Sequence, residues 1–254
     1  MRDDTNPHVA PTQIATPEPD PHFIKSLPPD SGTAPKEKNW VWERAMTNVK
    51  NQGKCGCCWA FTIAAVIESH VFIQTKKKES LSPQNLLDCV RNKYGRENSC
   101  TKGSMLDAFK YVVEAGGIET DKDYPYQEKQ ADTCGYNPDK KSATVKDFKR
   151  VETGNENLLR DVVGLIGPVA CGIDASDNAF RFYKSGIYNS TSCGQTMDSI
   201  NHSVVIAGYG TEAGLDYWLV KNSWDSTWGD GGYAKIARNS NVCSIATDTY
   251  YPIL

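Results

Sequence analysis

Cys58 is the first residue of the chain that could carry out covalent chemistry. It lies between a glycine-containing loop, residues 51–57, and an apolar segment that continues to Gln74 and is compatible with a helix. The first turn of a helix has free N–H groups and carries the positive end of the helix dipole, and both favour a thiolate over a thiol. The sequence therefore predicts a nucleophilic Cys58 at the start of a helix.

A nucleophilic thiolate needs a base, and the sequence offers four histidines. His8 and His22 lie in a proline-rich N-terminal segment. His70 follows Cys58 on the same predicted helix, where a rise of ~1.5 Å per residue places it roughly 18 Å away. His202 begins an apolar, strand-like run that ends in glycines. Elimination therefore pairs Cys58 with His202.

A third group is needed to orient the imidazole of His202. Asn222 ends residues 217–222, a run rich in β-branched and aromatic residues that is typical of a strand and could lie beside the strand of His202. Its amide oxygen would hold the ring as the third member of a catalytic triad does. The residues alone thus predict a site of Cys58, His202 and Asn222.

Three ordered motifs resemble the papain-like cysteine peptidases, especially their cathepsin L-type members. The motifs are QGKCGCCW at residues 52–59, NH at residues 201–202 and NSW at residues 222–224. The resemblance extends from about Trp40 to Pro252. It implies an α+β fold with a mainly helical domain, an antiparallel β-barrel-like domain and the active-site cleft between them.

The resemblance also implies a role for each matching residue. Cys58 would be the nucleophile, His202 its partner and Asn222 the residue that orients His202. Gln52 would donate a side-chain N–H to an oxyanion hole completed by the backbone N–H of Cys58. Trp224 would cover the contact between His202 and Asn222. The implied reaction is hydrolysis of a peptide bond through a thioester, with no cofactor and no metal.

The substrate site can be described only through the resemblance. Its residues would be Gly103, Met105, Gly172, Asn201, Ser203, Trp224 and Asp248. Met105 and Gly172 would make the pocket for the residue two positions before the scissile bond apolar and roomy. Asp248 stands where the family has a small or apolar residue, and a carboxylate there could accept Arg or Lys. We therefore expect an aliphatic or aromatic preference with tolerance for basic residues.

The nine cysteines do not reveal a pairing by themselves. The resemblance implies the disulfides Cys55–Cys100, Cys89–Cys134 and Cys193–Cys243, with Cys57, Cys58 and Cys171 free. Cys171 lies inside an apolar run, where we expect a small buried residue. Three disulfides are typical of an oxidising or lysosomal route, so a lysosomal or secreted location is expected.

Two sequons for N-glycosylation occur in the chain. Asn189 begins one of them on an expected loop, and we predict glycosylation there. Asn201 begins the other, but its side chain should be buried near His202.

The composition excludes several partners. A net charge of -3 gives no sign of nucleic-acid binding, and no run approaches the ~20 apolar residues that cross a bilayer. We expect a monomer that binds protein or peptide substrates and is inhibited by proteins of the cystatin type or by a pro-segment. The interval from Cys89 to Cys100 is too short and histidine-free for the occluding loop of cathepsin B-like exopeptidases, which favours an endopeptidase.

Changes in residue composition along the chain predict three parts. Residues 1–26 contain five prolines and no apolar core of a secretory signal, and are interpreted as a flexible leader. Residues 27–147 should form the mainly helical domain, with an N-terminal segment that crosses to the other domain. Residues 148–254 should form the β-barrel-like domain, with one helix at 156–165 and a C-terminal tail that crosses back. Because the family's long inhibitory pro-segment is missing, the chain is interpreted as a mature or nearly mature form.

The pattern leaves alternatives open. Cys55, Cys57 and Cys58 could be metal ligands, but no second Cys/His cluster at zinc spacing accompanies them. A non-catalytic homologue and a metal-dependent hydrolase are the competing classes. Cys57, where serine or alanine is usual, could also silence the enzyme through a Cys57–Cys58 disulfide. Asp225 is a further departure, because glycine is usual after Trp224.

Overall fold

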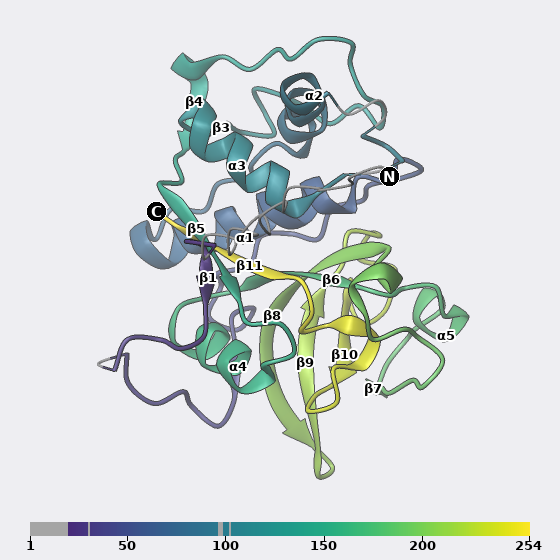
Figure 1. Ribbon diagram of the computed structural model, residues 1–254. Coiled ribbons are helices and arrows are strands. Elements are labelled where there is room, and N and C mark those ends of the chain that lie inside the picture. Colours follow the sequence, from purple (N-terminus) through teal and green to yellow (C-terminus); the bar gives the residue numbers. More distant parts are fainter. Residues whose placement is uncertain (1–19, 30, 96–98, 102) are drawn as a thin grey trace, which may run out of the picture.

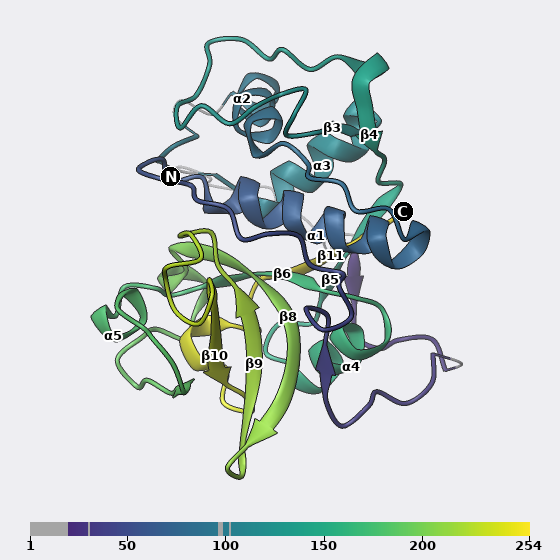
Figure 2. The same ribbon diagram turned by 180° about the vertical axis from the view of Figure 1, so that it is seen from behind.

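The computed structural model describes residues 20–254 except residues 30, 96–98 and 102. Two predicted features lie outside the described residues. One is most of the leader, residues 1–19, and the other is Lys102, which the resemblance to the papain-like peptidases places at the edge of the substrate cleft. Figure 1 shows a layer of helices above a large sheet, and Figure 2 shows the same two layers from behind. This is the α+β arrangement expected for a papain-like fold. The exact domain boundaries stay a prediction.

The central helix is α1 (Cys58–Thr75), and it begins at Cys58 as predicted. It packs against α2 and α3 on one side and against strand β8 on the other, so its residues are apolar around most of the circumference. By length and composition α1 could cross a membrane, but 67% of it is buried inside the protein, as in a core helix. It ends at Lys76, whose φ of 62° lies in the left-handed region.

Two further helices begin and end at residues whose types favour helix ends. In α2 (Pro83–Tyr94) the Ser82 hydroxyl accepts a 2.9 Å hydrogen bond from the N–H of Asn85. In α3 (Met105–Ala115) Ser104 accepts the N–H of Asp107 at 3.2 Å, and the helix stops at Gly116 in the left-handed region. Serine caps satisfy N–H groups that the first turn leaves free, which stabilises both helix starts.

The sheet follows the order β1-β5-β11-β6-β8-β9-β10-β7, with β2 paired to β8. Most neighbours are antiparallel, and β8 and β9 form a long hairpin. Its strands are β1 (Phe23–Ile24), β2 (Lys38–Asn39), β5 (Asp147–Val151), β6 (Val169–Ile173), β7 (Ile187–Tyr188), β8 (His202–Glu212), β9 (Leu215–Lys221), β10 (Tyr233–Ala237) and β11 (Thr249–Ile253).

Smaller elements complete the fold. The short strands β3 (Ile118–Glu119) and β4 (Lys141–Ala143) pair beside the helices. Three 3₁₀ turns are η1 (Pro138–Lys140), η2 (Met197–Ser199) and η3 (Val242–Ser244). Helix α4 (Glu156–Leu165) lies at the predicted place, but the prediction of a single helix in this part was wrong. A second, α5 (Asn178–Arg181), starts where Asp177 accepts the N–H of Ala179 at 2.8 Å, and four residues are too few to show helical periodicity.

The prediction of a flexible leader was wrong for the part of residues 1–26 that the structure describes. Phe23 and Ile24 form β1, which pairs in parallel with β5. The ring of His22 stacks on Phe148 at 4.1 Å, and its Nδ1 lies 3.0 Å from Asp147. The edge of β5 not paired with β11 offers backbone groups to this segment, and that long-range partner cannot be read from the local sequence.

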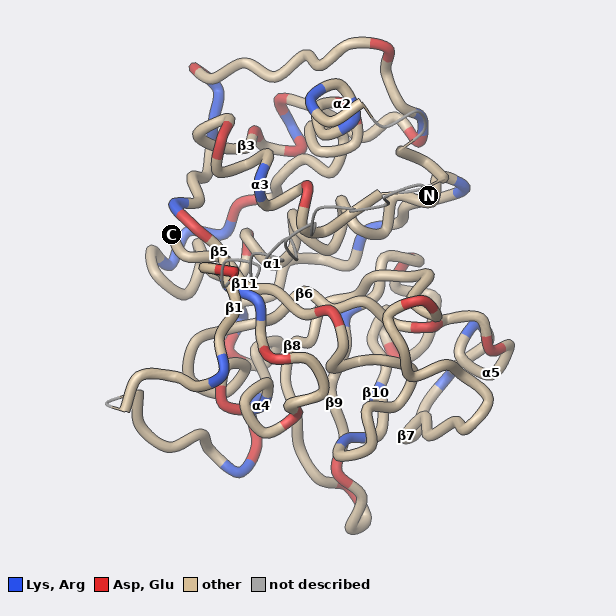
Figure 3. The backbone as a smooth tube through the Cα atoms, viewed as in Figure 1, with Lys and Arg blue, Asp and Glu red and all other residues tan. Residues whose placement is uncertain are grey.

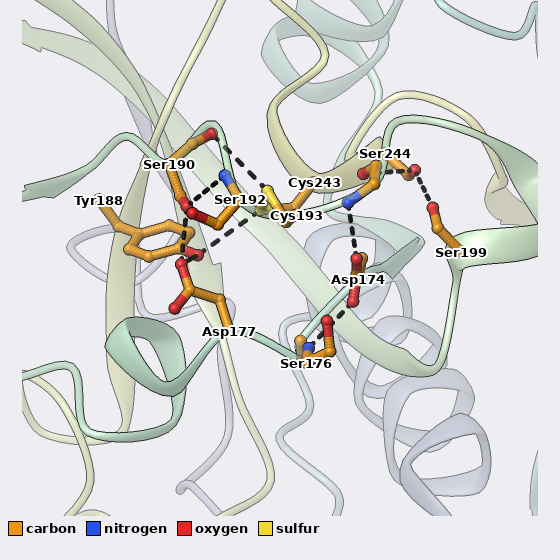
Figure 4. The surroundings of a disulfide bond; sticks show 12 residues. Asp174, Ser176, Asp177, Tyr188, Ser190, Ser192, Cys193, Ser199, Cys243 and Ser244 are labelled. Atoms are coloured by element: carbon orange, nitrogen blue, oxygen red, sulfur yellow. Dashed lines mark hydrogen bonds between the residues drawn. A yellow bond between two sulfur atoms is a disulfide. The ribbon is translucent and has the colours of Figure 1, made fainter.

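Three disulfides join loops to these elements. They are Cys55–Cys100, Cys89–Cys134 and Cys193–Cys243, the pairs that the resemblance implies. Figure 4 shows the third, surrounded by polar side chains that include Tyr188 and Asp177, whose Oδ2 accepts the Tyr188 hydroxyl at 2.8 Å. Cys57, Cys58 and Cys171 are free, and Cys171 is fully buried in β6.

Charged residues of both signs are spread over the tube in Figure 3. Among them, Glu68 and Lys221 are buried. Glu68 of α1 is 1% exposed and lies 3.1 Å from the Nζ of Lys50. Lys221, which ends β9, is 5% exposed and donates to the backbone oxygen of Thr47. Burial lowers the pKa of Lys221 to about 8. This cluster ties α1 to the strand that leads into Asn222.

His70 makes the fold sensitive to acid. Its Nε2 donates a 2.9 Å hydrogen bond to the oxygen of Pro168, and burial lowers its pKa from 6.5 to about 4. The unfolded chain therefore binds a proton more readily, and stability is lost as pH falls from 6.5 toward 4. We expect His70 to contribute about 2 kcal/mol of the loss between pH 7 and pH 5. Urea unfolding of the wild type and His70→Gln at both pH values measures this, and equal losses would contradict it.

Candidate active site

Cys58 and His202 meet where α1 crosses β8. Cys58 is the first residue of α1, and His202 is the first residue of β8. The helix packs directly against this strand, as both ribbon views show (Figures 1 and 2). The thiol and the imidazole are hydrogen-bonded, and the two residues are only 8% and 6% exposed. The structure thus brings together the two groups that elimination pairs, while His70 is bonded to Pro168 instead.

The two groups shift each other's pKa toward the charged forms. Burial alone would raise the pKa of the Cys58 thiol, but the charge and hydrogen bond of His202 and backbone hydrogen bonds at Ser203 and Trp59 lower it below its ordinary value. Burial alone would lower the pKa of His202, yet the bonds to Cys58 and Asn222 raise it. A lowered thiol pKa beside a raised imidazole pKa favours a thiolate–imidazolium pair.

Asn222 and Trp224 hold the imidazole from the other side. The Nε2 of His202 lies 2.8 Å from the Oδ1 of Asn222, which also accepts the N–H of Ser223 at 2.8 Å. Because the amide oxygen accepts, Nε2 carries a proton and Nδ1 faces Cys58. The Trp224 ring lies 4.6 Å from the imidazole ring, tilted by 31°. Among the described residues, the buried Nδ2 of Asn222 has no hydrogen-bond partner.

Gln52 is buried beside the same segment. Its Nε2 donates to the oxygen of Cys55 at 2.9 Å, and its Oε1 accepts the Ser223 hydroxyl at 2.7 Å. The backbone N–H of Gln52 also donates to the oxygen of Ser223 at 2.9 Å. A primary amide has two N–H groups, so one N–H of Gln52 remains for a ligand. The loop before α1 is thereby joined to the segment that follows β9.

The residues assigned to the substrate site lie in two groups. Gly103 packs so closely on the indole of Trp59 that an added Cβ would lie 1.9 Å from its Nε1, and Met105 is buried at the start of α3. Gly172 of β6 pairs with Ser203 of β8. The N–H of Gly172 also donates to the backbone oxygen of Asp248 at 2.9 Å. Gly172, Ser203 and Asp248 are therefore neighbours.

The carboxylate of Asp248 already has two partners. Its Oδ1 accepts the Tyr250 hydroxyl at 2.7 Å and lies 3.7 Å from a guanidinium nitrogen of Arg150. Burial raises the pKa of Asp248, and the contacts with Tyr250 and Arg150 oppose that rise. Arg150 on β5 is a partner that the sequence did not indicate, because it lies 98 positions earlier in the chain.

Asn201 and Asn189 differ in how their side chains are used. The amide of Asn201 donates to Asp174 and accepts the N–H of Ala175, both at 2.9 Å. The side chain of Asn201 is therefore hydrogen-bonded within the protein. Asn189 is exposed on the loop after β7, a placement compatible with glycosylation.

The structure accommodates the departures from the family pattern at Asp225 and Cys57. Asp225 has a φ of 70°, a left-handed conformation that glycine adopts without strain, and its Oδ1 accepts the N–H of Thr227 at 3.0 Å. Cys57 and Cys58 are both free rather than joined to each other. Cys55 is bound to Cys100, which removes it as a metal ligand in the alternative reading.

Sequence reasoning assigned no role to Ser223 or Tyr126. Ser223 stands inside the motif that carries Asn222, and its hydroxyl holds Gln52. The position next to Asn222 is a signal that could have identified it. Tyr126 contacts Gln52 and Cys57 from a loop about 70 residues away, and no local pattern indicates that contact.

Several known proteins are similar to this chain in sequence or structure. A family described as "Papain family cysteine protease" matches residues 34–253. Cathepsin L of Sarcophaga peregrina is 45% identical over 228 residues, which cover 89% of this chain and 66% of that protein. Cathepsin S of Mus musculus is 44% identical over 222 residues, which cover 87% of this chain and 64% of that protein. The chain thus spans about two thirds of the length of these relatives.

Solved structures agree with the sequence relatives. Digestive procathepsin L 3 of Tenebrio molitor larval midgut superimposes with a TM-score of 0.84 at 36% identity, covering 92% of this chain and 74% of that one. Digestive procathepsin L2 from the same source gives a TM-score of 0.84 at 39% identity, covering 91% of this chain and 73% of that one. With a cysteine and a histidine hydrogen-bonded across the two layers and a family match over nearly all described residues, this chain belongs to the papain family of cysteine proteases.

Proposed function

We propose that the protein is a cysteine endopeptidase that cleaves proteins or peptides through a thioester on Cys58. The observation that carries the proposal is the buried, hydrogen-bonded pair of Cys58 and His202, with Asn222 2.8 Å from the far side of the ring. The thiolate attacks the carbonyl carbon of the scissile bond, and His202 protonates the leaving amine. Water then hydrolyses the thioester, with His202 as the base.

Charge develops on the carbonyl oxygen during each attack. The remaining side-chain N–H of Gln52 and the backbone N–H of Cys58 would donate to that oxygen. Oxyanion donors act best when they are fixed before the reaction, and Gln52 is already held by Cys55 and Ser223. Trp224 covers the imidazole and limits the access of water to the His202–Asn222 bond.

The relatives support proposals for the location, the substrates and the inhibitors of the enzyme. Cathepsin L and procathepsin L proteins are among the similar chains, two of them from a digestive midgut source. We infer a lysosomal or secreted enzyme that acts as a monomer on protein substrates. Its inhibitors would be a pro-segment or proteins of the cystatin type. The three disulfides fit an oxidising route.

The pocket for the residue two positions before the cleaved bond would prefer apolar side chains and tolerate basic ones. Met105 and Gly172 would supply the apolar, open part, and Asp248 would supply the charge. Arg150 competes with a substrate cation for Asp248, because its guanidinium is 3.7 Å from Oδ1. Since burial raises the pKa of Asp248, tolerance for basic residues should increase as pH rises and the carboxyl ionises.

We expect Asp248→Ala to lower the ratio of kcat/KM for Arg over Leu at this substrate position roughly tenfold, the equivalent of ~1.4 kcal/mol. Arg150→Met should raise the same ratio, because it removes the competing cation. Paired fluorogenic peptides that differ only at this position measure both. Equal ratios in the wild type and Asp248→Ala would show that Asp248 does not contact the substrate.

The experiment that tests the proposed activity is digestion of an internally quenched peptide with blocked ends, followed by mass analysis of the products. We expect internal cleavage that is stopped by an epoxysuccinyl inhibitor and unaffected by a metal chelator. Loss of activity with the chelator would support a metal-dependent hydrolase. Absence of cleavage under reducing conditions would support a non-catalytic homologue.

A further inference from the structure

The loop that carries Gln52 is contacted by a second loop, residues 126–128. The hydroxyl of Tyr126 donates a 2.7 Å hydrogen bond to the backbone oxygen of Gln52. The Oε1 of Glu128 accepts a 2.6 Å hydrogen bond from the N–H of Lys54. Each bond joins residues 74 positions apart, so the second loop supports the first through tertiary contacts.

Glu128 also fills the space above Gly53. Gly53 has a φ of 59°, and a Cβ built there would lie 2.3 Å from the carboxyl carbon of Glu128. Glu128 itself has a φ of 57°, which is unusual for a residue with a side chain. A strained backbone persists where surrounding contacts fix it, and here the carboxylate is bonded to the loop of Gln52. Its side chain is exposed, so the bond to Lys54 is the contact that places it.

Tyr126 links Gln52 to the residue beside the nucleophile. Its ring packs edge-on against Phe61 at 4.8 Å, and its oxygen lies 3.1 Å from the Sγ of Cys57. Because the hydroxyl hydrogen is donated to Gln52, the Cys57 thiol can act only as the donor toward Tyr126, and the backbone oxygen of Cys55, 3.6 Å away, is a second acceptor for it. Burial raises the pKa of Cys57 to about 11, so the thiol keeps its proton near neutral pH. Tyr126 therefore contacts both Cys57 and the backbone of Gln52.

We propose that Tyr126 and Glu128 are positioning residues that fix the loop of Gln52 for oxyanion binding. This proposal rests on the oxyanion role proposed for Gln52. The bonds of Tyr126 and Glu128 to this loop reach backbone atoms of Gln52 and Lys54, and the side-chain amide of Gln52 is in turn bonded to Cys55 and Ser223. Loss of the outer contacts would let the backbone move and carry the free N–H of Gln52 away from the oxyanion.

The test compares peptide hydrolysis with alkylation of Cys58 by iodoacetamide, a reaction that forms no oxyanion. Tyr126→Phe removes only the hydroxyl, and Glu128→Gly removes the carboxylate while relieving the backbone strain. We expect kcat to fall roughly tenfold in Tyr126→Phe and roughly threefold in Glu128→Gly, because small displacements of catalytic groups are costly. KM and the alkylation rate should stay within about twofold of the wild type. Glu128→Gln keeps an acceptor oxygen and should restore kcat.

Double variants separate this proposal from the role of Gln52. In a Gln52→Ala background, Tyr126→Phe should cost nothing further, because the donor it positions is gone. Three results would overturn the positioning role while leaving the oxyanion role of Gln52 in place. They are a further tenfold loss of kcat in the double variant, a wild-type kcat in both single variants, and an alkylation rate that falls together with kcat. A Gln52→Ala variant with full turnover would instead remove the oxyanion role, and this proposal with it.

Discussion

Replacement of Cys58 by alanine is expected to lower kcat for peptide hydrolysis by roughly 10⁶-fold, to the level of background cleavage. The reason is that Cys58 supplies the only atom that bonds to the substrate in the proposed mechanism. His202→Ala should cost nearly as much, because without the imidazole the thiol loses the charge that lowers its pKa. The two losses should not add, since the pair acts as one unit.

The matched control for this prediction is Cys171→Ala. Cys171 is also a free, buried thiol, but it lies inside β6 and takes no part in the proposed chemistry. Its replacement should leave kcat unchanged, and circular dichroism of the three variants should be the same as that of the wild type. Measurable turnover by Cys58→Ala above background would mean that another residue is the nucleophile.

Gln52→Ala is expected to lower kcat by roughly 10²–10³-fold with little change in KM, because an oxyanion donor acts mainly in the transition state. The rate of alkylation of Cys58 by iodoacetamide should be retained, which would show that the thiolate is intact. Active-site titration with the same reagent checks that the variant is folded.

Ser223→Ala is the companion variant for Gln52. It removes the 2.7 Å hydrogen bond to the Oε1 of Gln52 but leaves both N–H groups in place. We expect a smaller loss of kcat than in Gln52→Ala, because the amide remains held through Cys55. If Gln52→Ala turned over as fast as the wild type, the backbone N–H of Cys58 would have to stabilise the oxyanion without Gln52.

Local signals in the sequence account for the helices around the nucleophile. Ser82, Ser104 and Gly116 mark the ends of α2 and α3, and continuous apolar residues mark α1. The pairing of Cys58 with His202 followed from the scarcity of histidines. Each of these inferences depends on residue types that have a strong preference for one local structure or one kind of chemistry.

The remaining features depend on contacts between distant parts of the chain. Phe23 and Ile24 form a strand only because β5 presents an open edge. Arg150 meets Asp248 across neighbouring strands, and Tyr126 meets Gln52 across two loops. No local pattern encodes these partners. The sequence alone therefore predicts Cys58, His202 and Asn222 better than it predicts the residues that contact the site from distant parts of the chain.

The most direct test of the thiolate–imidazolium pair is mass spectrometry of the protein after treatment with an epoxysuccinyl inhibitor. The pair predicts one adduct per chain, with fragment ions that place it on Cys58 and not on Cys57, and no adduct in His202→Ala over the same time. An adduct on Cys57 or Cys171, or an equal rate of labelling in His202→Ala, would contradict it.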